Sequence, residues 1–145
     1  MPWAQLLANN TVTALAPTKV ELDNLRSIVA RSLKDVKVPG LSVDARFIMA
    51  YDAARTLSLI IVRAAGYRPR TVGGHYNTFV ALETADPAFA VLSAYFDGCR
   101  IKRNRSEYDA AGEVSETDAA GLVATVHRFA IDVEAWVKTR HPNLA

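Results

Sequence analysis

The stretch "VDARFIMAYDAARTLSLIIVRAA", residues 43–65, decides the fold of this chain. Drawn as a helix, it carries apolar residues on nearly every side rather than along one stripe. Three large aliphatic side chains lie off its main apolar face: Ile48, Leu59 and Ile60. A helix of this kind is expected at the centre of a bundle, or partly covered by a second subunit.

Local start signals predict this helix and two others. Ser42 is a suitable N-cap directly before the central helix. Thr18, with Glu21 three residues later, has the capping-box pattern and begins an earlier amphipathic helix. Ser115, with Asp118 at the third helical position, begins the last one. The three helices are therefore bounded by polar residues that can bind the free backbone N–H groups of a first turn.

Two more helices complete the predicted fold. Residues 71–83, "TVGGHYNTFVALE", begin as a glycine loop and continue as a short helix. Asp86 and Pro87 form an N-cap and N1 pair that opens a further long helix. No segment alternates as a strand would. The predicted fold class is all-α, an antiparallel four- or five-helix bundle that forms one domain over residues 1–145.

Composition excludes several classes of protein. The chain of 145 residues is 50% hydrophobic and 22% charged, with a net charge of +2, which is a globular balance and no polycation. The only cysteine, Cys99, excludes an intramolecular disulfide and fits a reducing compartment. The longest apolar run, residues 57–62, is too short to span a bilayer. The N-terminal residues lack a signal-peptide pattern. We therefore expect a cytoplasmic protein without a membrane partner.

A basic motif, "RIKRNRSEYD" at residues 100–109, ends the penultimate helix. Its cationic residues are Arg100, Lys102, Arg103 and Arg105. At 100° per residue, Arg103 and Glu107 continue the apolar stripe that contains Phe96 and Cys99. Charged groups on a packing face need partners, because an unpaired buried charge is costly.

Two interpretations of this motif remain open. In the first, Arg100 or Arg103 closes an ion-pair network within the bundle. The candidate carboxylates are Glu107, Asp44 and Asp52. In the second, the guanidinium groups and the Asn104 amide line a half-buried cleft and bind phosphate. Arg46 and Arg55 are expected to pair with acids on neighbouring turns rather than to line that cleft.

Two segments carry a resemblance to a known family. "DARFIMAYDAARTLSLIIVRAAGYRPRTVGGH", residues 44–75, followed by "RIKRNRSEYD" resembles small stand-alone bacterial proteins of the HEPN superfamily. The resemblance covers about residues 42–140. It implies a four- or five-helix bundle, usually a homodimer whose motif helices face each other across a shared cleft. In active members, a motif of arginine, a polar residue and a histidine acts as a metal-independent ribonuclease.

The resemblance assigns roles to residues of the basic motif. Arg103 matches the arginine and Asn104 the polar residue, whereas Tyr108 stands where the histidine is expected. A phenol titrates near pH 10 and is a poor base, so Tyr108 does not inherit the histidine's role. Glu107 would orient an arginine, and His75, in its glycine loop, could reach the cleft. The candidate phosphate-binding residues are Arg100, Arg103, Asn104 and His75.

The main functional hypothesis is an RNA- or nucleotide-phosphate-binding protein of a toxin–antitoxin, defence or stress module. One alternative is an active ribonuclease, with Tyr108 or His75 as the base. A second is a non-catalytic interaction module that pairs with a cognate antitoxin or nucleotidyltransferase. No metal or cofactor is expected, since the sequence has no zinc-ligand cluster, EF-hand loop or P-loop.

Overall fold

The computed structural model describes residues 1–106 and 113–145, so Glu107 and Tyr108 lie outside the described residues. The predicted all-α class is confirmed, because most of the described chain is helical. The α-helices are α1 (Trp3–Ala8), α2 (Lys19–Asp35), α3 (Val43–Ala64), α4 (Gly74–Ala85), α5 (Ala90–Asn104) and α6 (Glu116–Arg140). Two short 3-10 helices are η1 (Pro87–Phe89) and η3 (Pro142–Leu144). None of the helices in the described ranges is long and apolar enough to cross a membrane.

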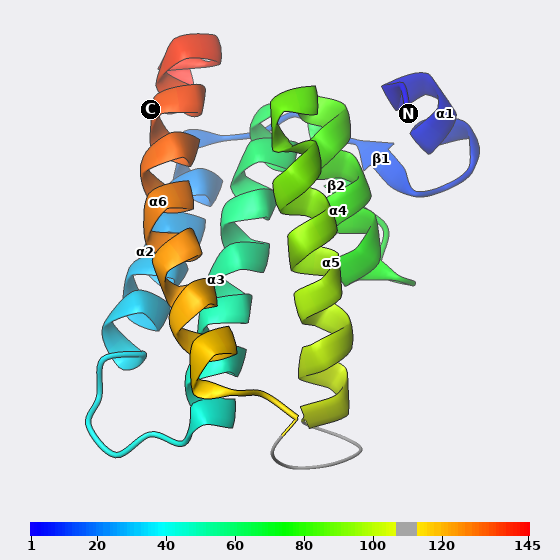
Figure 1. Ribbon diagram of the computed structural model, residues 1–145. Coiled ribbons are helices and arrows are strands. Elements are labelled where there is room, and N and C mark those ends of the chain that lie inside the picture. Colours follow the sequence, from blue (N-terminus) through cyan, green and yellow to red (C-terminus); the bar gives the residue numbers. More distant parts are fainter. Residues whose placement is uncertain (107–112) are drawn as a thin grey trace.

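Helix α3 is the centre of the bundle. It packs against α2, α4, α5 and α6 and lies between α2 and α6 on one side and α4 and α5 on the other (Figure 1). Ile60 is fully buried within the chain, and Ile48 and Leu59 are half-buried. The central position of α3 is thus confirmed. The suggestion that a second subunit covers Ile60 is wrong, because other elements of the same chain cover this side chain.

The predicted helix starts are confirmed by their caps. The Ser42 hydroxyl accepts a hydrogen bond of 3.0 Å from the backbone N–H of Ala45, and Thr18 accepts one of 3.2 Å from Glu21. At the start of α6, Ser115 and Asp118 form a reciprocal capping box. These local contacts bind N–H groups that have no partner within their own helix.

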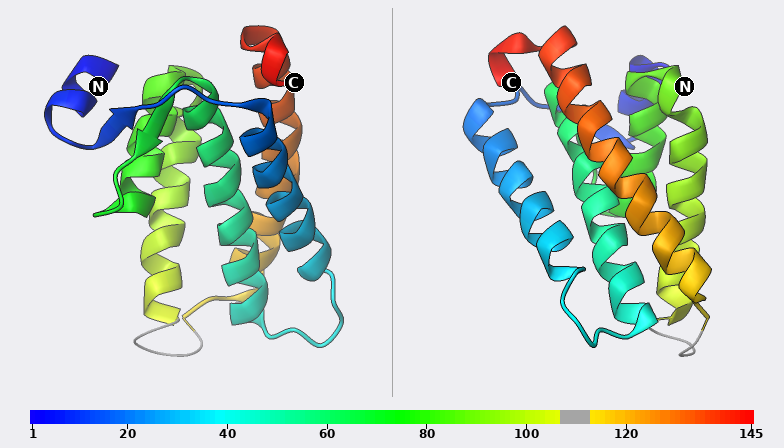
Figure 2. Two further views of the ribbon diagram at one scale, coloured as in Figure 1. Left: turned by 180° about the vertical axis from the view of Figure 1, so that it is seen from behind. Right: turned by 60° about the vertical axis from the view of Figure 1, so that its left-hand side comes forward.

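The expectation that the chain has no strands is wrong. Strand β1 (Val12–Ala14) pairs antiparallel with β2 (Tyr67–Pro69), the segment that follows α3. Trp3 of α1 stacks on Tyr67, with ring centroids 3.9 Å apart and planes 8° apart. A small second core joins these elements to α3 and α4, and its buried residues are Leu6, Val12, Val62 and Ala81. The N-terminal segment therefore docks on the bundle beside β2 (Figure 2).

Arg63, in the last turn of α3, joins three parts of the fold. Its side chain is 3% exposed, and its Nε and Nη2 each donate a 3.0 Å hydrogen bond to the Glu21 carboxylate of α2. Its guanidinium also donates to the backbone carbonyls of Leu15, Ala16 and Tyr67. Glu21 therefore pairs with Arg63, and this contact holds β2 and the start of α2 at the end of α3.

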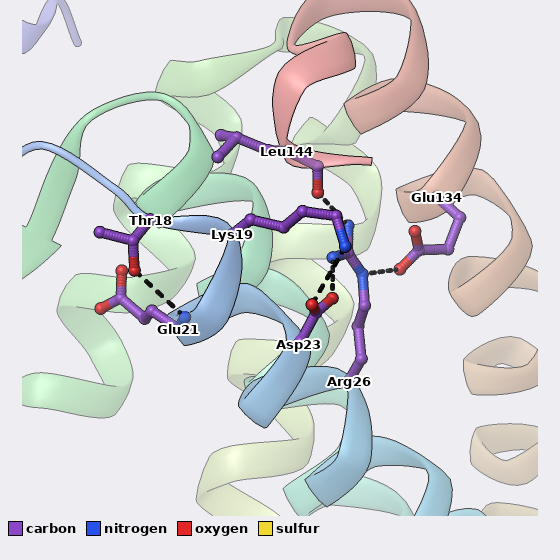
Figure 3. A network of polar contacts seen from close by, with 7 residues as sticks. All are labelled: Thr18, Lys19, Glu21, Asp23, Arg26, Glu134 and Leu144. Carbon is purple, nitrogen blue, oxygen red and sulfur yellow. Dashed lines mark hydrogen bonds and ion pairs between the residues drawn. The ribbon is translucent and has the colours of Figure 1, made fainter.

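A second arginine links α2 to the C-terminal part of the chain. Arg26 donates to Asp23 on its own helix, to Glu134 on α6 and to the backbone carbonyl of Leu144 in η3, at 2.8, 3.0 and 2.7 Å (Figure 3). Lys19 also donates to Asp23, at 3.1 Å. The carboxylates of this network are about half exposed, so each pair contributes little on its own.

Candidate functional site

A tyrosine and a histidine form the centre of the candidate site. Tyr51 of α3 is fully buried, and its hydroxyl shares a hydrogen bond of 3.0 Å with Nδ1 of His75. His75 lies in the first turn of α4. Gly73 precedes this helix with φ of 71°, a left-handed conformation that favours glycine. The glycine loop predicted from the sequence thus places His75 against α3.

Three arginines surround this pair. The Cζ atom of Arg103 lies 5.7 Å from the centroid of the Tyr51 ring. The Cζ atom of Arg100, one turn earlier on α5, lies 5.7 Å from the Tyr76 ring centroid. Arg55 is half-buried and follows Tyr51 by one turn of α3. Arg55, Arg100 and Arg103 are called the arginine cluster below. The structure therefore brings together the predicted residues Arg100, Arg103 and His75.

The pKa values in the site follow from burial and from these cations. Burial, and after it the positive charges of Arg55, Arg103 and Arg100, together lower the pKa of His75 to about 4. Burial raises the pKa of the Tyr51 hydroxyl. At pH 7 both groups are therefore neutral, and neither balances the charge of the arginine cluster.

The ion pairs of the basic motif differ from those expected. Arg100 donates its Nε to Asp97 of its own helix at 2.7 Å, an acid that the sequence analysis did not consider. Arg103 donates a hydrogen bond of 3.3 Å to the side-chain oxygen of Asn104, so the side chains of these two predicted site residues are in contact. Lys102 pairs with Asp118 at the start of α6. The ion-pair interpretation is thus supported for Arg100, although with a different carboxylate.

Arg46 forms an ion pair as expected, although with a more distant acid, whereas Arg55 does not. Arg46 pairs with Glu116 of α6, which is an acid on another helix rather than on a neighbouring turn. Arg55 forms no ion pair within residues 1–106 and 113–145, and its Nε is buried there without a hydrogen-bond partner. Together with His75 it lines a groove of about 410 Å³. A ligand in this groove can therefore reach Arg55, one member of the arginine cluster, and His75.

Sequence reasoning did not include Tyr51 and Arg55 in the site. The ring of Tyr51 lies in the core on the apolar face of α3, but its hydroxyl reaches His75. Arg55 is four residues later and thus on the same side of the helix. The spacing of these two residues was a signal that could have placed Arg55 at the site.

Cys99 has no part in this chemistry. It is 5% exposed on the packed side of α5, and burial raises its pKa to about 11. The thiol is therefore protonated at pH 7 and is a small core group rather than a nucleophile.

The pH behaviour of His75 tests this electrostatic description. In the folded protein we expect its imidazole to titrate near pH 4, well below the ordinary value of 6.5. As the pH falls from about 6.5 to about 4, the unfolded chain gains a proton that the folded protein does not, so His75 lowers stability in that window. NMR titration of the ring protons measures the value directly.

Arg55→Met is the informative variant for this titration. Removing one cation should raise the pKa of His75 toward 6.5. A wild-type value near 6.5, or one that Arg55→Met leaves unchanged, would show that the cluster does not act on His75.

Comparison of the chain with protein-family models, with curated proteins and with solved structures finds no significant match. The resemblance to the HEPN superfamily therefore stays a prediction. The function has to be inferred from the chemistry of the arginine cluster and the Tyr51–His75 pair.

Proposed function

We propose that this protein binds RNA through its phosphate groups at the arginine cluster. The supporting observation is that Arg55, Arg100 and Arg103 surround the Tyr51–His75 pair, whose groups are neutral at pH 7. Asp97 pairs with Arg100, whereas Arg55 forms no ion pair within the described residues, so a bound anion would offset the like-charge repulsion at Arg55. Guanidinium groups match the oxygens of a phosphate with paired hydrogen bonds, so phosphate is the favoured anion.

An aromatic ring beside the cluster favours a nucleotide over inorganic phosphate. Tyr76 is 51% exposed, and the guanidinium of Arg100 lies over its ring. Exposed aromatic rings next to cations are common stacking partners for bases of single-stranded RNA. Asn104, beside Arg103, adds an amide that can bind a phosphate or a base edge.

The biological setting of this proposal rests on the HEPN resemblance alone. It would be a toxin–antitoxin, defence or stress module in the cytoplasm, with two copies of the chain forming a HEPN-like homodimer. The coarser observations fit such a setting, since the described chain is a helical bundle with no helix able to cross a membrane.

A second candidate function is metal-independent cleavage of RNA, with His75 as the base. A neutral imidazole can accept a proton at pH 7, and the hydrogen bond with Tyr51 fixes its ring. A pKa near 4 makes a weak base, but a phosphate bound among the arginines would raise it. A neighbouring guanidinium would stabilise the charge that develops on the attacked phosphate.

Binding of a fluorescent ten-nucleotide single-stranded RNA, measured by anisotropy from low to high salt, tests the proposal. Three phosphate contacts predict that the logarithm of the binding constant falls with the logarithm of salt concentration with a slope of at least about −2. Absence of binding, or binding that salt does not weaken, would contradict the proposal. Gel analysis of the same RNA would detect cleavage and separate the two candidate functions.

A further inference from the structure

The groove lined by Arg55 also reaches β2. Its cationic lining includes Arg55, Arg68 and Arg70, and His75 lies at the same wall. Arg68 and Arg70 also line a second groove, of about 650 Å³, on the side of β1. The two grooves together are called the basic groove below. The two grooves adjoin at β2, because Arg68, Arg70 and the residue between them line both parts.

The short sheet holds these two arginines in place. Arg68 and Arg70 are two residues apart, so both lie on the opposite side of the strand from Tyr67. Tyr67 is fixed by its stacking on Trp3. The backbone N–H of Arg70 donates to the carbonyl of Thr11 at 2.9 Å. The docking of the N-terminal segment therefore positions two cations along one wall.

The basic groove has a surplus of positive charge. Arg68 and Arg70 are exposed, and neither forms an ion pair with another residue of the described ranges. Glu21, the acid in the lining, is held by Arg63 through two 3.0 Å hydrogen bonds. The groove therefore presents Arg55, Arg68 and Arg70 without a matching carboxylate among its described lining residues.

Two further features of the lining suit an anionic chain. One wall is formed by Gly74 and His75 of the first turn of α4 and by Thr78 of the next turn, and the N-terminus of a helix favours negative charge. Leu59 of α3 also lines the groove, so part of its apolar surface is available to a sugar or a base. A row of cations beside apolar surface is typical of sites that follow a single nucleic-acid strand.

We infer that the basic groove carries the continuation of the RNA strand whose phosphate binds at the arginine cluster. The ligand class is then single-stranded RNA of several nucleotides rather than a mononucleotide. This inference rests on the proposed function, because the cluster supplies the first phosphate contact. Arg68 and Arg70 supply further phosphate contacts along the same strand.

Replacing both exposed arginines tests the inference. Arg68→Gln with Arg70→Gln should weaken binding of a ten-nucleotide single-stranded RNA by about tenfold and reduce the salt slope by about 1.4, or about 0.7 for each lost contact. Binding of adenosine 5′-monophosphate, followed by NMR shifts of the His75 ring, should not change. Circular dichroism checks that the variant is folded, as expected for two exposed positions.

A matched control removes the same charge elsewhere. Arg31→Gln with Lys37→Gln changes two exposed residues, one in the last turns of α2 and one just after it, and should leave RNA affinity and salt slope unchanged within about twofold. Equal losses in the two double variants, or no loss in Arg68→Gln with Arg70→Gln, would overturn the inference and leave the arginine-cluster proposal intact. If the wild-type protein binds neither ligand, the proposed function itself fails.

Discussion

Replacing Arg63 with methionine is expected to lower the free energy of unfolding by about 3–5 kcal/mol. The Arg63 side chain is 3% exposed and binds both oxygens of Glu21. It also donates hydrogen bonds to three backbone carbonyls, two of them between β1 and α2 and one in β2. Methionine keeps much of the apolar volume but leaves these acceptors without their donor. Urea denaturation followed by circular dichroism measures the loss.

Arg26→Met is the matched control for this prediction. Arg26, like Arg63, binds both carboxylate and backbone carbonyl oxygens, in its case two carboxylates and one carbonyl. Its side chain is 20% exposed, and its partners Asp23 and Glu134 are 49% and 48% exposed, so water replaces the lost contacts. We expect a loss of about 1 kcal/mol or less. Equal losses in the two variants would mean that the buried Arg63 network does not hold the β1–β2 segment to α3.

The central helix and the helix starts could be predicted because their signals are local. A helix that is apolar on nearly every side, such as α3, must be buried by other elements, whichever elements these are. Each helix start depends on a cap side chain that accepts a hydrogen bond from the backbone N–H three residues later, as seen for Ser42, Thr18 and Ser115. The two strands could not be predicted. Each is three residues long, which is too short for alternation to appear, and their pairing joins segments more than fifty residues apart.

In the candidate site, the sequence predicted only those features that depend on the spacing of residues within a single helix. The 100° spacing placed Arg103 toward the packed side of α5, and the residue is half-buried there. The partner of Arg100 is Asp97, three residues earlier on the same helix, and it was not among the predicted carboxylates. The contact of Tyr51 with His75 joins two helices, and neither helix's own pattern indicates it.

Arg103→Ala is expected to weaken RNA binding about tenfold to a hundredfold, since hydrogen bonds to charged groups contribute about 1.5–3 kcal/mol. Stability should fall by only about 1 kcal/mol, from the lost packing and cation–π contact with Tyr51. If Arg103 instead closes an ion-pair network with Glu107, the same change should cost about 3–5 kcal/mol. Adding Glu107→Gln would then restore much of that stability.

Arg105→Ala provides the control for charge. Arg105 is two residues away at the same helix end and is exposed, so this variant makes the same change in net charge outside the cluster. Its loss of affinity should be about twofold or less, because the long-range effect of one exposed charge is screened by salt.

The most direct measurement is therefore an anisotropy titration of one single-stranded RNA with the wild-type protein, Arg103→Ala and Arg105→Ala at the same salt concentration. Binding that Arg103→Ala weakens at least tenfold, and Arg105→Ala by no more than about twofold, is the result predicted for a phosphate site at the arginine cluster. Equal affinities in the two variants, or RNA binding that Arg103→Ala leaves unchanged, would contradict it.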